Sequence, residues 1–148
     1  MPSAPLVSLL IPTHNNARTI GETVQSCLRQ SFGDLDLLIY DEERRDGTLD
    51  ILQKLASQDP RIRLMTSPTN SGPLRAWRKL LHEARGRYAT FVWSDDLLLP
   101  RYVETLAGVL QKHPQDLLAG CNAYRYYLPD DPQVPVEPAN LDKPNASW

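Results

Sequence analysis

The chain has 148 residues, of which 41% are hydrophobic and 23% charged, and this is the usual size of one globular domain with its own core. Its 16 basic and 18 acidic residues give a net charge of -2, so the chain as a whole lacks the positive field that nucleic acid or an anionic membrane surface attracts. Cys27 and Cys121 lack the close spacing of a zinc or redox pair, and we expect two buried thiols in a reducing compartment. We also expect no export signal and no membrane span, hence a cytoplasmic protein, free or peripheral to the inner face of the membrane.

Strand and helix patterns alternate from residue 6 to residue 121. The strands are predicted by short apolar runs, which are typical of strands buried on both faces. They span residues 6–11, 35–40, 62–65, 88–93 and 117–121. The helices are predicted by apolar residues at helical spacing, over about 17–30 and in stretches that follow Asp46, Pro73 and Pro100.

Several residues mark the ends of these elements. Pro12 stops the first predicted strand. Thr19 and Glu22 form a capping-box pattern at the start of the first helix, and Asp46 is the expected cap of the second. Pro73 stands at a first-turn position, where proline is favoured.

The alternation predicts an α/β fold: a Rossmann-like, mostly parallel sheet with helices on both faces, in three αβα layers. The composition changes after Leu128, where five prolines fall between residues 129 and 144. We therefore expect one domain over residues 1–128, incomplete at its C-terminal end, followed by a Pro-rich loop or linker over 129–148.

The polar segments that follow the predicted strands are the candidate site, because ligands of open parallel sheets bind outside the carboxyl ends of the strands. These segments are Pro12–Asn16, Asp41–Glu43, Asn70–Gly72 and Ser94–Asp96. Together they carry five carboxylates, whose mutual repulsion is tolerable if a cation or hydrogen-bond donors lie between them.

Other nucleotide-binding folds fit these segments poorly. The chain has no Gly-x-x-x-x-Gly-Lys-Ser/Thr phosphate loop, and no Gly-x-Gly-x-x-Gly follows the first predicted strand. A phosphate-receiver domain would have an acidic pair after its first strand, whereas the acids here follow the second and the fourth.

The chain resembles the family 2 glycosyltransferases with the GT-A fold over roughly Val7 to Pro100. Each motif is weak alone, but their order and spacing together are specific. The matching segments are Val7–Asn15, Ser26–Phe32, Tyr40–Glu42, Asp46–Thr48, Asp59–Arg63, Asn70–Gly72, Ala84–Tyr88, Ser94–Asp96 and Leu99–Pro100.

The resemblance implies an inverting enzyme that transfers a sugar from a nucleoside diphosphate to a carbohydrate, lipid or protein acceptor, with this chain as its donor-binding half. It implies nucleotide contacts from Pro12, Thr13, Asn15, Asp41, Glu42 and Asp95. Asp95 and Asp96 would hold a divalent cation, Mn²⁺ or Mg²⁺, on the diphosphate. In relatives the catalytic base lies further along than residue 148, so the resemblance names none here.

The chain also departs from the family pattern. Trp93 stands where many relatives have the first Asp of an Asp-x-Asp triplet, and Glu42 and Glu43 replace a more usual Asp-Gly. Arg75 or Arg78 could contact the diphosphate if their helix start faces the site. Two alternatives stay open: a non-catalytic binding module on the same scaffold, and a plain helix-capping turn at Asp95-Asp96.

Overall fold

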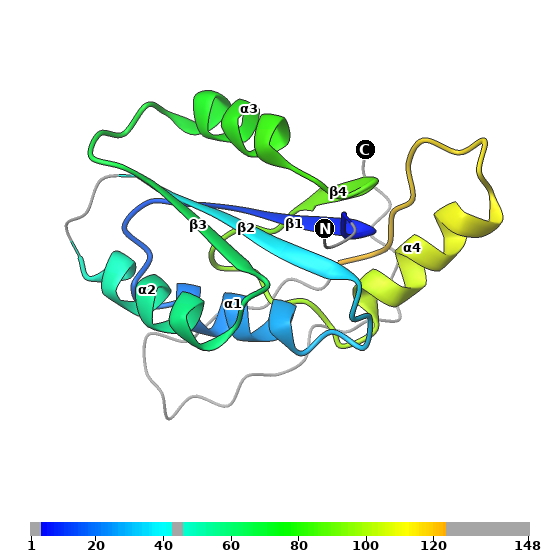
Figure 1. The fold of residues 1–148 in the computed structure, drawn as a ribbon, viewed down its shortest axis with the longest axis horizontal. Helices are drawn as coiled ribbons and strands as arrows, with labels where there is room; N and C mark the ends of the chain where they lie inside the picture. Colours follow the sequence, from blue (N-terminus) through cyan, green and yellow to red (C-terminus); the bar gives the residue numbers. More distant parts are fainter. Residues whose placement is uncertain (1–3, 43–45, 124–148) are drawn as a thin grey trace.

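The computed structural model describes residues 4–42 and 46–123 and shows strands and helices in strict alternation (Figure 1). No helix within these ranges is long and apolar enough to cross a bilayer. The elements are β1 (Val7–Thr13), α1 (Ile20–Leu28), β2 (Leu35–Glu42), α2 (Thr48–Gln58), β3 (Ile62–Ser67), α3 (Pro73–Glu83), β4 (Tyr88–Phe91) and α4 (Tyr102–Lys112).

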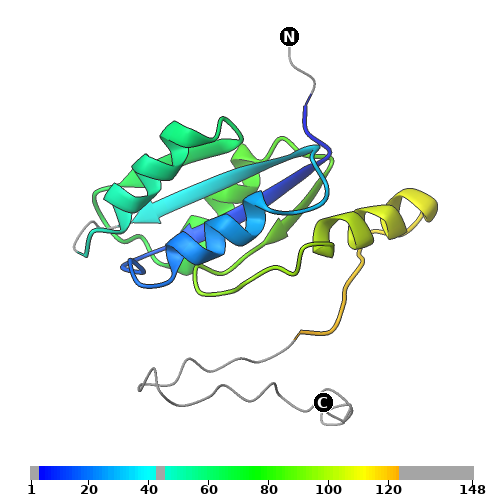
Figure 2. The ribbon, with the colours of Figure 1, turned by 90° about the horizontal axis from the view of Figure 1, so that it is seen from below.

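The four strands form one parallel sheet in the order β3-β2-β1-β4. Helix α3 covers one face, and α1 and α2 cover the other, with α4 beside them (Figures 1 and 2). The predicted α/β fold with a parallel sheet and helices on both faces is therefore confirmed. Because β1 is central and covered on both sides, all but one of its seven residues are buried.

Alternate residues of the strands fill two separate cores. Leu9 and Ile11 of β1 point toward α1, α2 and α4, whereas Leu10 of β1 and Leu38 of β2 lie under α3. All four side chains are fully buried, and burial of each contributes on the order of 1.5–3 kcal/mol. This double burial explains why the strands appear in the sequence as continuous apolar runs.

Strand β1 continues through Pro12, contrary to the prediction that this proline stops it. The carbonyl groups of Leu6 and Leu10 accept hydrogen bonds from β4 and the residue after it, so even-numbered residues of β1 direct their backbone groups toward β4. Pro12 is next in this alternation, but β4 has already ended at Phe91. Its missing N–H therefore removes no bond from the sheet.

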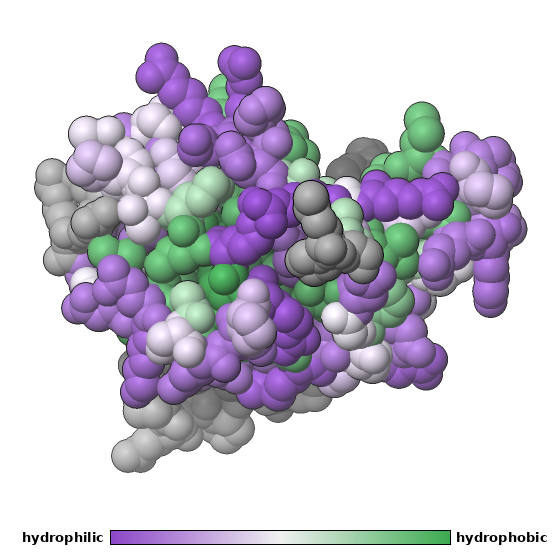
Figure 3. All heavy atoms as spheres, in the orientation of Figure 1, coloured by the Kyte–Doolittle hydropathy of each residue, from purple (hydrophilic) through white to green (hydrophobic). Residues whose placement is uncertain are grey.

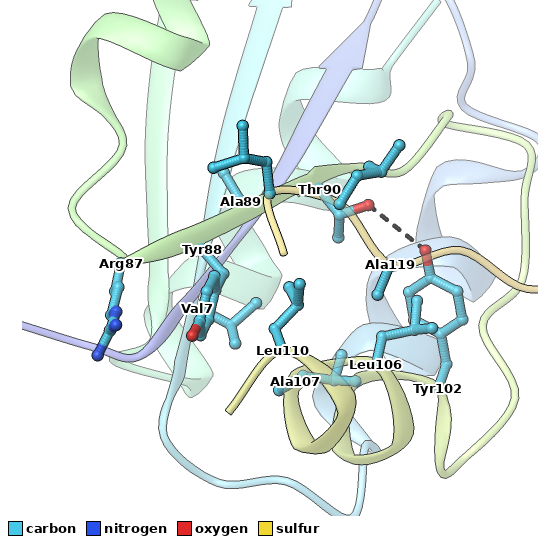
Figure 4. Close-up of a pocket in the computed structure, with 13 residues that line it drawn as sticks. Val7, Arg87, Tyr88, Ala89, Thr90, Tyr102, Leu106, Ala107, Leu110 and Ala119 are labelled. Carbon is cyan, nitrogen blue, oxygen red and sulfur yellow. Dashed lines mark hydrogen bonds between the residues drawn. The ribbon is translucent and has the colours of Figure 1, made fainter. Parts of the chain in front are cut away.

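The predicted fifth strand at 117–121 is wrong, since no strand forms there. Leu117 is 99% exposed, and the segment runs beside an apolar groove between β4 and α4 (Figure 4). It contains no β-branched residue and includes a glycine, a composition that disfavours strands. As a result Cys121 is exposed, not buried as predicted. Cys27 is buried as expected, and burial raises the pKa of its thiol to about 12.

Gly86 provides a test of the close approach between β1 and the start of β4. A Cβ at this position would lie 2.5 Å from the Ser8 nitrogen and 2.6 Å from the Tyr88 oxygen, both of them backbone atoms. We expect Gly86→Ala to lower the free energy of unfolding by about 1–3 kcal/mol, because two strands must move apart.

Gly108 is the matched control, since a Cβ there meets nothing within 4 Å and the residue lies inside α4. Gly108→Ala should raise the free energy of unfolding by roughly 0.5–1 kcal/mol. Both changes are measured by urea unfolding followed by circular dichroism. A Gly86→Ala protein as stable as the wild type would contradict the packing described.

Candidate functional site

The segments that follow the four strands meet at the carboxyl edge of the sheet, as predicted, and hydrogen bonds join them. The register of β1 and β2 places Thr13 directly beside Asp41. Both are buried, and within the described residues the Thr13 hydroxyl has no hydrogen-bond partner. Asn15 begins a tight turn after β1 with a left-handed φ of 52°, a conformation that asparagine tolerates.

Ser94 joins the segment after β4 to the segment after β1. The side-chain amide of Asn16 donates to the Ser94 hydroxyl, and the Thr19 hydroxyl donates to the Ser94 carbonyl at 2.9 Å. Ser94 is only 6% exposed. These bonds fix the turn that carries Asp95 and Asp96 relative to the loop after β1.

The use of Thr19 corrects the predicted capping box. Thr19 is indeed the N-cap of α1, but its side chain makes no capping hydrogen bond. Its hydroxyl instead donates across the site to Ser94. A local sequence pattern cannot reveal this hydrogen bond, because its two partners lie far apart in the chain.

Asp46 joins the loop after β1 to the start of α2. One of its carboxylate oxygens accepts from the Ala17 N–H at 2.9 Å, and the other accepts from the hydroxyl and N–H of Thr48 at 2.6 and 3.1 Å. The Thr48 hydroxyl also accepts from the Asn16 N–H at 2.9 Å. The N-cap position itself is Gly47, so the predicted cap lies one residue early but still satisfies an N–H of the first turn. The Thr48 hydroxyl, followed by these N–H groups, lowers the pKa of Asp46.

Glu42 joins β2 to the loop after β3. Its carboxylate accepts from both the hydroxyl and the N–H of Ser71, and the residue is only 3% exposed. The His14 Nδ1 atom lies 3.0 Å from the Glu42 carbonyl oxygen, which adds a contact to the loop after β1. Glu42 thus lies at the predicted edge, with its carboxylate oriented toward a neighbouring loop.

Asp95 and Asp96 are exposed at the same edge. They do not cap the next helix, because α4 begins at Tyr102 with Arg101 as its N-cap. Partial burial and the adjacent Asp95 carboxylate raise the pKa of Asp96. Two carboxylates that repel each other at an open edge are a suitable donor set for a divalent cation.

A cation at this pair would need further ligands. Within the described residues no group of three or more His, Cys, Asp and Glu side chains could enclose a metal ion. Mg²⁺ commonly binds through one or two carboxylates and takes its remaining ligands from water and substrate phosphates. The exposed pair fits that mode better than it fits a closed, all-protein metal site.

Aromatic rings lie next to this acidic turn. The Trp93 ring is 5.2 Å from that of Trp77 on α3 and 6.1 Å from that of Phe91 on β4. Trp77 packs on the core under α3, as predicted. Arg75 and Arg78 are exposed, and hydrophilic side chains gather over α3 (Figure 3).

The sequence indicated that the polar segments after the strands meet at one edge, but it did not predict the hydrogen bonds that join these loops. Asn16, Thr48, Ser71 and Ser94 make these bonds. All four lie in segments that the sequence singled out, but nothing in the sequence indicated which partners they bond. The bonds from Asn16 to Thr48, from Asn16 to Ser94 and from Ser71 to Glu42 each join residues at least 29 positions apart in the chain.

The model of the family described as Glycosyl transferase family 2 matches residues 8–139. The chain belongs to this family. A Haemophilus influenzae protein named as an uncharacterized glycosyltransferase is 34% identical over 110 residues, which cover 74% of this chain and 44% of that protein. The chain therefore spans less than half the length of this relative.

Two solved structures share the fold. Staphylococcus aureus TarS 1–349, in complex with UDP-GlcNAc, is 27% identical with a TM-score of 0.68, over 73% of this chain and 32% of that one. The mannosyltransferase PcManGT of Pyrobaculum calidifontis, in complex with GDP-Man and Mn²⁺, is 23% identical with a TM-score of 0.63, over 75% of this chain and 34% of that one. Both likenesses agree with the GT-A type of fold expected from the sequence.

The role of Asp46 predicts a pH-dependent contribution to stability. Its pKa in the folded chain is lowered, so its stabilisation is present above the unfolded value of about 3.9 and is lost as the pH falls through the lower folded value. Asp46→Asn should reduce the urea midpoint at pH 7, because asparagine offers one acceptor oxygen in place of two. The difference from the wild type should shrink when the titration is repeated at acidic pH.

Asp116→Asn serves as the control, because Asp116 is exposed and distant in sequence from these loops. Its urea midpoint should follow that of the wild type at both pH values. A difference between Asp46→Asn and the wild type that does not change with pH would contradict a charge-dependent role.

Proposed function

We propose that this chain binds a nucleoside-diphosphate sugar at the carboxyl edge of its sheet and is the donor-binding half of an inverting glycosyltransferase. The observation that carries the proposal is the pair of hydrogen bonds from Asn16 and Thr19 to Ser94. These bonds hold the Asp95-Asp96 turn against the loop after β1. A ligand with a polar base at one end and a diphosphate further along fits an edge built in this way.

In this proposal the nucleoside lies over β1 and β2. Thr13 and Asp41 are adjacent in the register, and Pro12 and Asn15 flank them. A carboxylate at this position accepts hydrogen bonds from the N–H groups of a base edge, and a hydroxyl serves as donor or acceptor. Glu42 supports the nucleoside site indirectly, because its carboxylate holds the Ser71 loop in place.

The diphosphate would lie next to Asp95 and Asp96, and these two carboxylates would hold a divalent cation. When bound, Mn²⁺ or Mg²⁺ supplies Lewis-acid stabilisation of the departing diphosphate. The protein's own contribution is the fixed position of the two carboxylates. The raised pKa of Asp96 implies that cation affinity falls as the pH drops, since only the ionised carboxylate is a good ligand.

The reaction itself is a displacement at the anomeric carbon. An acceptor hydroxyl forms the new C–O bond while the bond to the diphosphate oxygen breaks, and one such displacement inverts the configuration. A base must take the hydroxyl proton, and the proposal assigns this role to none of the described residues. The acceptor is a carbohydrate, lipid or protein hydroxyl.

Calorimetric titration of UDP and GDP, with and without Mn²⁺, tests the donor site. We expect one nucleotide to bind in a Mn²⁺-dependent manner. Asp95→Asn should weaken that binding by about tenfold or more, which corresponds to about 1.4 kcal/mol, because one charged cation ligand is lost. Asp41→Asn should weaken nucleotide binding with and without the metal.

Asp116→Asn, with its exposed side chain far from the site in sequence, should bind like the wild type. If Asp95→Asn still binds the nucleotide with the same dependence on Mn²⁺, the assignment of Asp95 and Asp96 as cation ligands is contradicted. Folded wild-type protein that binds neither nucleotide would overturn the proposed function in favour of a scaffold that keeps the fold alone.

A further inference from the structure

Trp93 is a partly exposed aromatic residue at the edge of the candidate site. Its side chain is 42% exposed, although its chain neighbours Val92 and Ser94 are buried at 2% and 6%. A tryptophan this exposed beside an acidic turn is unusual, since tryptophan is highly buried on average. Solvent exposure at this position therefore requires an explanation.

The Trp93 ring packs against two other aromatic rings. The rings of Trp93 and Phe91 are nearly parallel, with 9° between their planes and 6.1 Å between their centroids. Trp77 of α3 contacts Trp93 at 5.2 Å and Phe91 at 5.9 Å. Phe91, Trp93 and Trp77 thus form one aromatic cluster. Side chains that are already packed in this way lose little further conformational freedom when a ligand binds.

The aromatic cluster lies closer to the acidic pair Asp95-Asp96 than to Asp41, where the nucleobase is proposed to bind. Trp93 comes directly before the Ser94-Asp95-Asp96 turn, and the Asp96 N–H donates to the Trp93 carbonyl at 3.0 Å. Asp41 ends β2, which is separated from β4 by β1. At about 4.8 Å per strand spacing, Trp93 and Asp41 are on the order of 10 Å apart across the sheet.

We propose that the exposed face of Trp93 is a stacking platform for the transferred sugar ring of the donor. The inference rests on the proposed function, in which the base lies at Asp41 and the diphosphate at Asp95 and Asp96. The sugar follows the diphosphate, so it is the part of the ligand that an aromatic face beside the acidic turn can reach.

The chemistry of the two surfaces is complementary. One face of a pyranose ring carries mainly C–H groups, and these pack against the electron-rich face of an indole while the hydroxyl groups stay solvated. Contact of this kind removes apolar surface of both partners from water and needs no buried unpaired polar group. It selects for sugars with a continuous C–H face, such as rings whose hydroxyl groups are all equatorial.

The test compares each nucleotide with its sugar-bearing form. UDP, UDP-GlcNAc, GDP and GDP-mannose are titrated calorimetrically, in the presence of Mn²⁺, into the wild type, Trp93→Ala and Trp93→Phe. We expect the wild type to bind the sugar-bearing form of its nucleotide more tightly than the nucleotide. Trp93→Ala should weaken the sugar nucleotide about five- to tenfold and leave the nucleotide unchanged, and Trp93→Phe should retain most of the affinity.

Leu81→Ala is the matched control, because Leu81 is an exposed apolar side chain, 54% accessible, on the outer side of α3. It should change neither affinity. Tryptophan fluorescence adds a second measurement: the chain has three tryptophans, and a signal change specific to the sugar nucleotide should vanish in Trp93→Phe. Urea unfolding of each variant reports whether the fold is retained.

The outcomes separate this inference from the function on which it rests. Equal weakening of nucleotide and sugar nucleotide in Trp93→Ala, with Trp93→Phe also weakened, would place the ring against the nucleotide and overturn the inference while leaving the donor site intact. Unchanged affinity for both ligands would overturn it in the same way. Absence of nucleotide binding by the wild type would overturn the proposed function and the platform together.

Discussion

The bonds to Ser94 are the interaction on which the whole site depends. A parallel sheet brings the ends of its strands to one edge, but it does not fix the loops that follow them. Asn16 and Thr19 both donate to Ser94, one to its hydroxyl and one to its carbonyl, so the loops after β1 and β4 move as one unit. Because Ser94 is buried, loss of either donor would leave a polar group unsatisfied, and this cost keeps the geometry specific.

The carboxylates at this edge divide into those that hold the loops and those that stay exposed. Asp46 and Glu42 accept hydrogen bonds from neighbouring segments and so act as structural links. Asp95 and Asp96 remain exposed, and partial burial, followed by the neighbouring Asp95 carboxylate, raises the pKa of Asp96. The sheet edge thus carries two hydrogen-bonded carboxylates beside an exposed acidic pair, and in the proposed function a divalent cation would relieve the repulsion within that pair.

The sequence predicted the sheet because strands that are buried on both faces appear as continuous apolar runs between the helical patterns. Leu9, Leu10, Leu37 and Leu38 are indeed all fully buried. It erred where the outcome depends on distant partners. Pro12 stays in β1 because β4 ends early, and residues 117–121 form no strand. The site followed the same division: strand ends were predictable from local pattern, whereas the bonds of Thr19 and Asn16 to Ser94 span 75 and 78 residues and have no local signature.

In the proposed function, Trp93 shows how one residue can change the chemistry at one position of the site. An acidic side chain in its place would accept hydrogen bonds from ligand hydroxyl groups, and its contribution would depend on their arrangement. An indole ring that packs on Phe91 and Trp77 instead provides apolar contact surface, and this surface needs no hydrogen-bond partner from the ligand. Cation binding would then rest on Asp95 and Asp96 alone, while the neighbouring ring would contribute to affinity through the shape of the sugar. Separating charge from stacking in this way would let cation binding and sugar preference vary independently, since a substitution of the Trp93 side chain leaves Asp95, Asp96 and the hydrogen bonds of Ser94 in place.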